Sequence, residues 1–127
     1  TKNLRDRIRL RLQDHLSEVR ESHRLVNSPV CLVETEGLPP HLERLLRATQ
    51  PNMPKNKRVM EINPQHQAIQ FLGKLVERDD QRTDEYIDLL FDQALLSEGS
   101  PLPDPVRFVE RSREMLTEML RQAAEAS

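Results

Sequence analysis

An eleven-residue stretch near the end of the chain, residues 86–96, carries more apolar surface than an exposed helix needs. Its apolar members are Tyr86, Ile87, Leu89, Leu90, Phe91, Ala94, Leu95 and Leu96. Plotted as a helix at about 100° per residue, they cover about 260° of the circumference. A surface helix needs an apolar stripe of roughly 100° or a little more. The stretch therefore predicts a helix whose remaining apolar surface must be covered by something further.

The composition fits one soluble domain with an aliphatic core. The chain has 127 residues, of which 31% are charged, and a mean hydropathy of −0.69. No apolar run approaches the ~18 residues of a membrane span, which predicts no membrane partner. The single cysteine, Cys31, allows no internal disulfide and fits a reducing, cytoplasmic location. A first residue other than Met, Thr1, suggests a fragment or a processed chain.

Positive charge gathers at the start of the chain. The first twelve residues set one acidic residue, Asp6, against Lys2, Arg5, Arg7, Arg9 and Arg11. A basic arm of this kind can bind phosphate backbones, which would make the chain a small helical nucleic-acid-binding domain. The other interpretation is a solvated helix face, because no aromatic residue alternates with the arginines to stack on bases. We favour the solvated face and expect no nucleic-acid partner, with the nucleic-acid-binding domain kept as the alternative.

Apolar periodicity and chain breakers predict an α+β fold, with a small three-stranded sheet packed with helices. Leu4, Ile8, Leu12 and Leu16 recur every fourth residue and predict an N-terminal helix over residues 1–16. Residues 17–64 should form the sheet, from extended segments near 19–26, 28–33 and 55–63, with an amphipathic helix inserted at 39–50. Residues 64–124 should form a helical end.

The ends of the last three helices carry recognisable capping residues. Asn63 followed by Pro64 predicts an N-cap and a first helical position, and Thr83 predicts the next N-cap. Gly99 is a candidate left-handed terminator. Asp104 followed by Pro105 predicts the start of the last helix.

No constellation of residues predicts catalysis, a cofactor or a metal. The four histidines are scattered singly, without the spacing that a zinc site needs. His66 is best explained as a polar contact in the first turn of a helix. Cys31 lies inside an apolar strand, where a thiol acts as packing. We therefore expect no enzyme in this segment, with no catalytic, cofactor-binding or metal-ligating residue.

Four segments, taken in order, identify a resemblance that covers about residues 15–120. The segments are "LVNSPVCLVETEG", "LERLLRAT", "EINPQHQAI" and "LLFDQALLSEGSPLPDP". They closely resemble successive parts of the C-terminal domain of the ninety-kilodalton heat-shock chaperone family, of the bacterial HtpG type. The resemblance implies an ATP-dependent molecular chaperone of the stress response that assists protein folding. It also implies that ATP and Mg²⁺ bind in N-terminal and middle domains absent from this chain.

In that family the C-terminal domain is the homodimerisation module, with two helices from each protomer in a four-helix bundle. This implies that part of the wide apolar arc faces the chain's own sheet and the remainder faces a second copy. The implied dimer-interface residues are Ile87, Leu90, Phe91, Ala94, Leu95, Val109, Met115, Leu116, Met119 and Leu120.

The resemblance also implies a contact with unfolded or partly folded client proteins. The matching positions are Leu38, Leu42, Leu45 and Leu46, in the short helix at 39–50. Relatives often carry Met or aromatic residues there, so the same leucines could instead pack on the domain. The chain ends in "EAS" rather than the acidic pentapeptide of eukaryotic cytosolic members. We therefore expect no docking of tetratricopeptide-repeat cochaperones.

Overall fold

A three-stranded mixed sheet organises the first part of the chain. The computed structural model describes residues 2–23, 27–34, 40–49 and 57–126, and it divides the chain into two compact units, Thr1–Asp84 and Glu85–Ser127. The strands are β1 (Leu16–Glu21), β2 (Val30–Glu34) and β3 (Arg58–Ile62), in the order β1-β3-β2. β3 pairs in parallel with β1 and antiparallel with β2. The α+β class and the small three-stranded sheet are confirmed.

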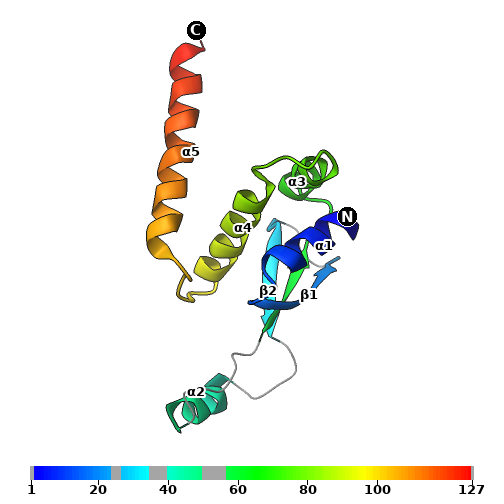
Figure 1. The fold of residues 1–127 in the computed structure, drawn as a ribbon, viewed down its shortest axis with the longest axis vertical. Coiled ribbons are helices and arrows are strands. Elements are labelled where there is room, and N and C mark those ends of the chain that lie inside the picture. Colours follow the sequence, from blue (N-terminus) through cyan, green and yellow to red (C-terminus); the bar gives the residue numbers. More distant parts are fainter. Residues whose placement is uncertain (1, 24–26, 35–39, 50–56, 127) are drawn as a thin grey trace. The chain divides into compact units, whose positions relative to one another are not determined.

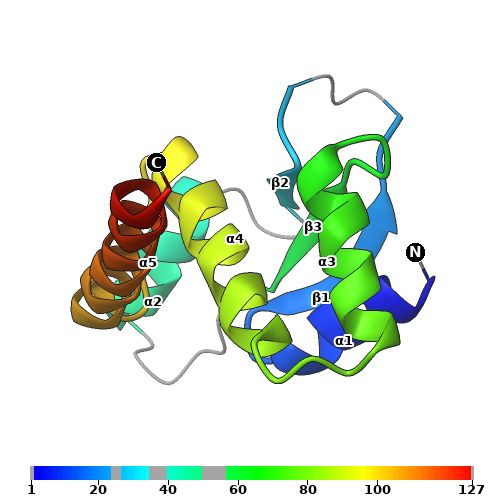
Figure 2. The same cartoon turned by 90° about the horizontal axis from the view of Figure 1, so that it is seen from above.

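Five helices complete the described part of the chain: α1 (Lys2–Arg11), α2 (Pro40–Thr49), α3 (Gln67–Glu77), α4 (Thr83–Ser97) and α5 (Pro105–Glu125). α1 lies against β1 and beside α3, as Figures 1 and 2 show. Within the described residues, no helix combines the length and apolar character needed to cross a bilayer.

The core of the first unit is aliphatic. α1 contributes Leu4 and Ile8, and α3 contributes Ile69, all 1% exposed. From β3 come Met60 and Ile62, which are 1% and 0% exposed. Burial of this kind stabilises a domain by about 1.5–3 kcal/mol for each large aliphatic side chain.

The predicted boundary between the first helix and the sheet was wrong. α1 ends at Arg11 rather than at residue 16, and β1 begins at Leu16 rather than near residue 19. Leu16 is still buried, but it pairs with Arg58 at the start of β3. The apolar spacing of four residues thus continues past the end of α1. The last residue of the pattern, Leu16, is held by strand pairing with β3 and not by a further helical turn. The remainder of the predicted segment, Arg24–Val26, lies outside the described residues.

The start of α3 also differs from the prediction. Asn63 is not the N-cap: its Oδ1 accepts a hydrogen bond from the backbone N–H of Gln65 at 3.0 Å and forms a turn. The helix begins three residues later, and His66 is the N-cap, with Nδ1 accepting from the N–H of Ala68 at 3.0 Å. The polar first-turn role expected of His66 is therefore correct, at a different position.

Thr83 is the first residue of α4, and its hydroxyl does not cap the helix. The Thr83 Oγ1 donates to the carbonyl of Asp80 at 2.6 Å, and the Thr83 side chain is fully buried. The side chain of Asp80 stabilises the same turn, because its carboxylate accepts a hydrogen bond from the Arg82 N–H at 2.9 Å.

Candidate interaction surface on the last two helices

The stop after α4 and the start of α5 are both built as predicted. Gly99 has φ +80°, and its N–H donates to the carbonyl of Leu96 while that of Ser100 donates to Leu95. These two bonds terminate α4 in a Schellman motif. Asp104 caps α5, accepting from the N–H of Arg107 at 3.0 Å, with Pro105 at the first helical position.

α4 and α5 are joined by an ion-pair cluster of three carboxylates and two arginines. The Arg111 Nη2 lies 3.1 Å from the Asp88 Oδ2, and its Nη1 lies 3.9 Å from the Asp92 Oδ2. Its Nε lies 3.5 Å from the Glu85 Oε1, which the Arg107 Nη2 also approaches, at 3.3 Å. The side chains of Arg111 and Asp92 are only 14% and 8% exposed. The part of the cluster made by Arg111, Asp88 and Asp92 is thus largely withdrawn from solvent, where charge pairs are screened less than at the surface, whereas Arg107 and Glu85 are 40% and 38% exposed.

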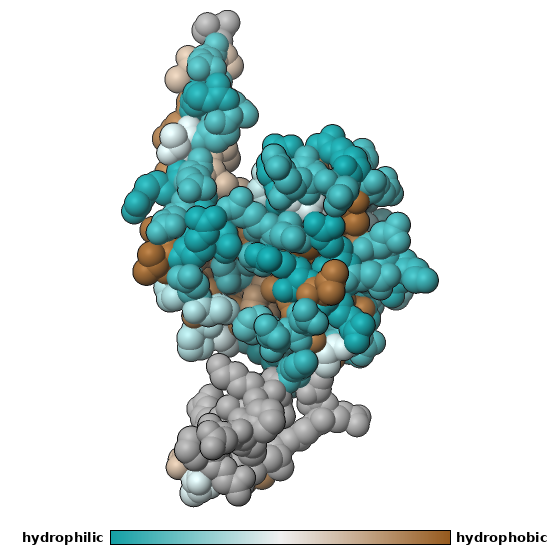
Figure 3. Space-filling model, viewed as in Figure 1, coloured by the Kyte–Doolittle hydropathy of each residue, from teal (hydrophilic) through white to brown (hydrophobic). Residues whose placement is uncertain are grey.

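Along α5, large apolar side chains are exposed before and after the polar segment 110–114. This α5 apolar row consists of Val106, Val109, Met115, Leu116, Met119 and Leu120, which are between 37% and 68% exposed. No residue of the 21-residue helix is buried. Apolar patches appear along α5 in Figure 3. An exposed apolar surface rimmed by charged residues is typical of a protein–protein contact.

The structure divides the ten predicted dimer-interface residues into two groups. Four residues of α4 are already buried in the single chain: Ile87, Phe91, Ala94 and Leu95, at 1–8% exposure. Leu90 is half-buried. The five residues of α5, from Val109 to Leu120, are all exposed. Most of the apolar arc of α4 is therefore buried in the single chain, although Leu96 is 50% exposed, and the five predicted interface residues of α5 are all uncovered.

Two of the four predicted client-contact leucines are exposed on α2. Leu42 is 41% exposed and Leu45 is 64% exposed. Leu38 lies outside the described residues, as does the side chain of Leu46. The exposure of Leu42 and Leu45 is compatible with a contact surface, and the contact itself stays a prediction.

The sequence reasoning did not predict the ion-pair cluster. A signal was present in the spacing. Asp88 and Asp92 are four residues apart in one helix, and Arg107 and Arg111 are four residues apart in the next. Side chains at that spacing share a helix face, so two complementary charged faces were readable.

The basic face of α1 is partly used inside the first unit. The Arg7 Nε donates to the Asp84 Oδ1 at 2.9 Å, and its Nη1 donates to the Asp79 Oδ1 at 3.2 Å. These hydrogen bonds, that with Asp84 first, raise the pKa of Arg7 above its ordinary value. Arg7 is therefore committed to its own chain, which favours the solvated-face interpretation over phosphate binding.

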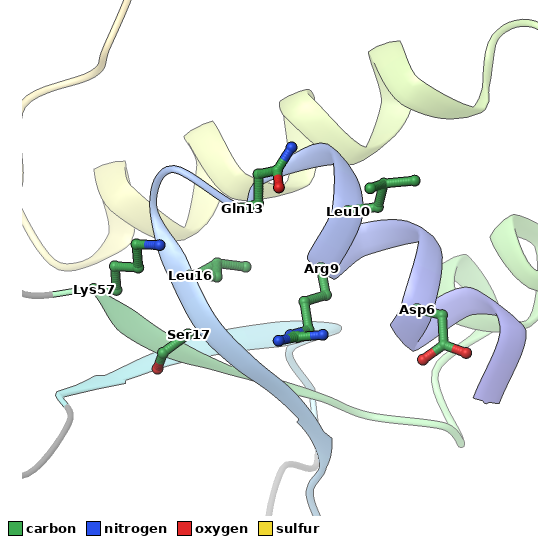
Figure 4. Close-up of a pocket in the computed structure, with 7 residues that line it drawn as sticks. All are labelled: Asp6, Arg9, Leu10, Gln13, Leu16, Ser17 and Lys57. Atoms are coloured by element: carbon green, nitrogen blue, oxygen red, sulfur yellow. The ribbon is translucent and has the colours of Figure 1, made fainter.

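A hollow of about 600 Å³ lies beside α1 and the start of β1, as Figure 4 shows. Its walls are Asp6, Arg9, Leu10, Gln13, Leu16, Ser17 and Lys57. The lining mixes both charges with an exposed leucine, without the converging polar groups that fix a small ligand. Within the described ranges, no three His, Cys, Asp or Glu side chains come together as a metal site.

The described residues form a small α+β unit followed by a second unit whose last helix exposes the α5 apolar row. A sequence model described as Hsp90 protein matches residues 1–127, and the chain belongs to the Hsp90 family. It is 45% identical to the chaperone protein HtpG of Myxococcus xanthus, over 97% of this chain. It is 44% identical to the HtpG of Geobacter metallireducens over 86% of this chain, and 42% to that of Alkalilimnicola ehrlichii over 94%.

The matched segment is a small part of each relative. It covers 20% of the Myxococcus protein, 17% of the Geobacter protein and 18% of the Alkalilimnicola protein. The membership in the heat-shock chaperone family predicted from the four motifs is confirmed, while the nucleic-acid-binding alternative receives no support from these relatives.

Proposed function

We propose that this chain is the C-terminal homodimerisation domain of an HtpG-type, ATP-dependent chaperone. Two copies associate through their α4–α5 pairs in a four-helix bundle around a two-fold axis. The observation that carries the proposal is the exposure of the α5 apolar row on a helix that buries none of its own residues. A long amphipathic helix gains most of its stability from packing, so this one requires a partner surface.

A second copy of the chain fits that requirement. A two-fold axis places the same surface on both sides, so one apolar row is covered by its own copy. Removing large apolar side chains from water stabilises by about 1.5–3 kcal/mol each when burial is complete. Six such side chains in the row give an association of useful strength even after the ordering costs of binding.

The second element of the proposal is a contact with unfolded clients through α2. Exposed Leu42 and Leu45 can accept apolar segments that a folded protein would hide. In the whole cytoplasmic protein, ATP and Mg²⁺ act in regions outside this chain. The segment itself contributes dimerisation and client contact, without a cofactor or a catalytic residue.

The mass in solution tests the proposal. At micromolar concentration, sedimentation equilibrium should give twice the chain mass of 14.8 kDa. The association should persist as salt is raised, because apolar burial is not screened, whereas phosphate-backbone binding weakens steeply with salt. A folded chain that remains monomeric at these concentrations would contradict the proposal.

A further inference from the structure

α5 is attached to the rest of its unit only at its beginning. Four of its residues are half-buried, and all four lie in the first two turns: Arg107, Phe108, Arg111 and Ser112. Every later residue of the helix is exposed. The direction in which the remaining turns project is therefore set by a very short contact.

Two of those four residues are the arginines of the ion-pair cluster. Phe108 and Ser112 offer one large apolar side chain and one small polar one, which can bury surface but define few directional bonds. Arg111 lies within 3.1–3.9 Å of three carboxylates on successive turns of α4. The contact with Asp88 is a hydrogen bond, and the approaches to Glu85 and Asp92 are longer ion-pair contacts that favour the same orientation of the planar guanidinium.

We propose that Arg111 is the positioning residue of self-association: by binding Glu85, Asp88 and Asp92, it holds α5 at one direction on α4 and so presents the α5 apolar row ready for a second copy. The proposal rests on the dimerisation function proposed above. A rigid row binds more tightly than a mobile one, because less conformational freedom is lost on association. Arg111 itself lies outside the row and need not touch the partner.

If Arg111 only stabilised the fold, its replacement would lower the stability of the folded chain. The core of the first unit, around Ile8, Met60 and Ile69, contains none of the residues of the cluster. Loss of Arg111 should thus weaken association while leaving that core intact. The two effects can be measured separately in the full chain, by sedimentation for association and by amide exchange of β3 for the core.

The test compares Arg111→Met with Arg121→Met. Both remove one arginine from α5, but the ion pairs of Arg121 among the described residues are with Glu118 and Glu125 of its own helix. Arg111→Met should raise the dimer dissociation constant about tenfold or more. Arg121→Met should change it by about twofold or less, as expected of exposed pairs. Exchange at β3 should match the wild type in both variants.

A double-mutant cycle tests whether Asp88 is the carboxylate through which Arg111 acts. It includes a variant that should not disturb folding. Asp88→Asn keeps the shape of the side chain and removes its charge, so it weakens the same pair without enlarging the site. We expect it to weaken dimerisation, and we expect the double variant with Arg111→Met to be no weaker than Arg111→Met alone. Additive effects of the two changes would overturn the assignment of this pair.

Two further outcomes separate this inference from the proposed function. A dimeric wild type with an unchanged dissociation constant in Arg111→Met overturns the positioning role and leaves dimerisation standing. Equal weakening by Arg111→Met and Arg121→Met also overturns it, because the effect would then follow net charge. A folded but monomeric wild type overturns both.

Discussion

Asp80 is the most heavily hydrogen-bonded carboxylate of the turn between α3 and α4. It accepts from the Nε and Nη2 of Arg82, from the Arg82 backbone N–H, and from Arg78 at 3.4 Å. The side-chain hydrogen bonds from Arg82, followed by the backbone bond, hold the pKa of Asp80 far below its ordinary value of 3.8. The charged form of Asp80 is therefore favoured by folding.

Replacement of Asp80 by Asn should lower the melting temperature in a pH-dependent way. A carboxylate whose pKa falls on folding stabilises fully above its unfolded pKa and loses that contribution as pH falls toward the folded value. The difference in melting temperature between wild type and Asp80→Asn should be constant from pH 7 to about 5 and should shrink below about pH 4. Calorimetry across that range measures it, and a difference independent of pH would contradict the role of the charge.

Capping residues were predictable only where a single local hydrogen bond or backbone conformation determines the helix end. Gly99 and Asp104 act through their own backbone conformation or their own side chain, and both were identified from sequence. Asn63 and Thr83 do not cap a helix as predicted, and His66 makes the expected first-turn contact but from the N-cap position, which was not foreseen. Asn63 and His66 can both cap a helix start, and the conformation of the turn between them selects His66.

At the scale of single elements, α5 carries the clearest expectation. Leu116→Arg or Leu120→Arg would place an unpaired charge in the proposed contact, at a cost of several kcal/mol. Both positions are exposed in the single chain, at 51% and 59%, so the chain itself should tolerate the change. We expect folded monomers by sedimentation and circular dichroism.

Glu114→Arg is the matched control, since it adds the same side chain to the polar side of α5. It should remain dimeric. Loss of the fold in Leu116→Arg would show that α5 packs inside its own chain, against the exposure described here.

The α2 leucines predict a loss of binding without a loss of stability. Substitution of core leucines by Ala costs about 2–5 kcal/mol, whereas exposed substitutions cost little. Leu42→Ala combined with Leu45→Ala should therefore weaken binding of an unfolded client, measured by anisotropy, while the melting temperature stays nearly constant. The opposite pattern, a large fall in melting temperature with client binding intact, would identify both as packing residues.

Most elements were readable from sequence because their signals are local. β2 follows Pro29 with a β-branched run, and β3 has its own apolar core, so both were found close to their observed limits. The strand order, the register of Arg20 opposite Glu61 and the ion-pair cluster could not be derived. They depend on which distant segments meet, and single-residue preferences carry little information about that.

For the molecule as a whole, the two units should differ in how strongly their backbone amides are protected from hydrogen exchange. Amides of β3 lie in the centre of the sheet and should exchange only by extensive unfolding. Residues in the second half of α5 are exposed, so their amides should exchange quickly once the dimer dissociates. Hydrogen exchange on Leu116→Arg should show fast exchange in α5 and protection in β3, and uniform protection across both would contradict this.

The middle strand of the sheet is also the last of the three to be synthesised. β2 ends at Glu34 and β3 ends at Ile62, with β1 still earlier. At about 5–20 residues per second, a ribosome needs between about 1 and 6 s to make the intervening chain. During that interval β1 and β2 have no strand between them to bond. The sheet can therefore close only after the residues of β3 have been synthesised.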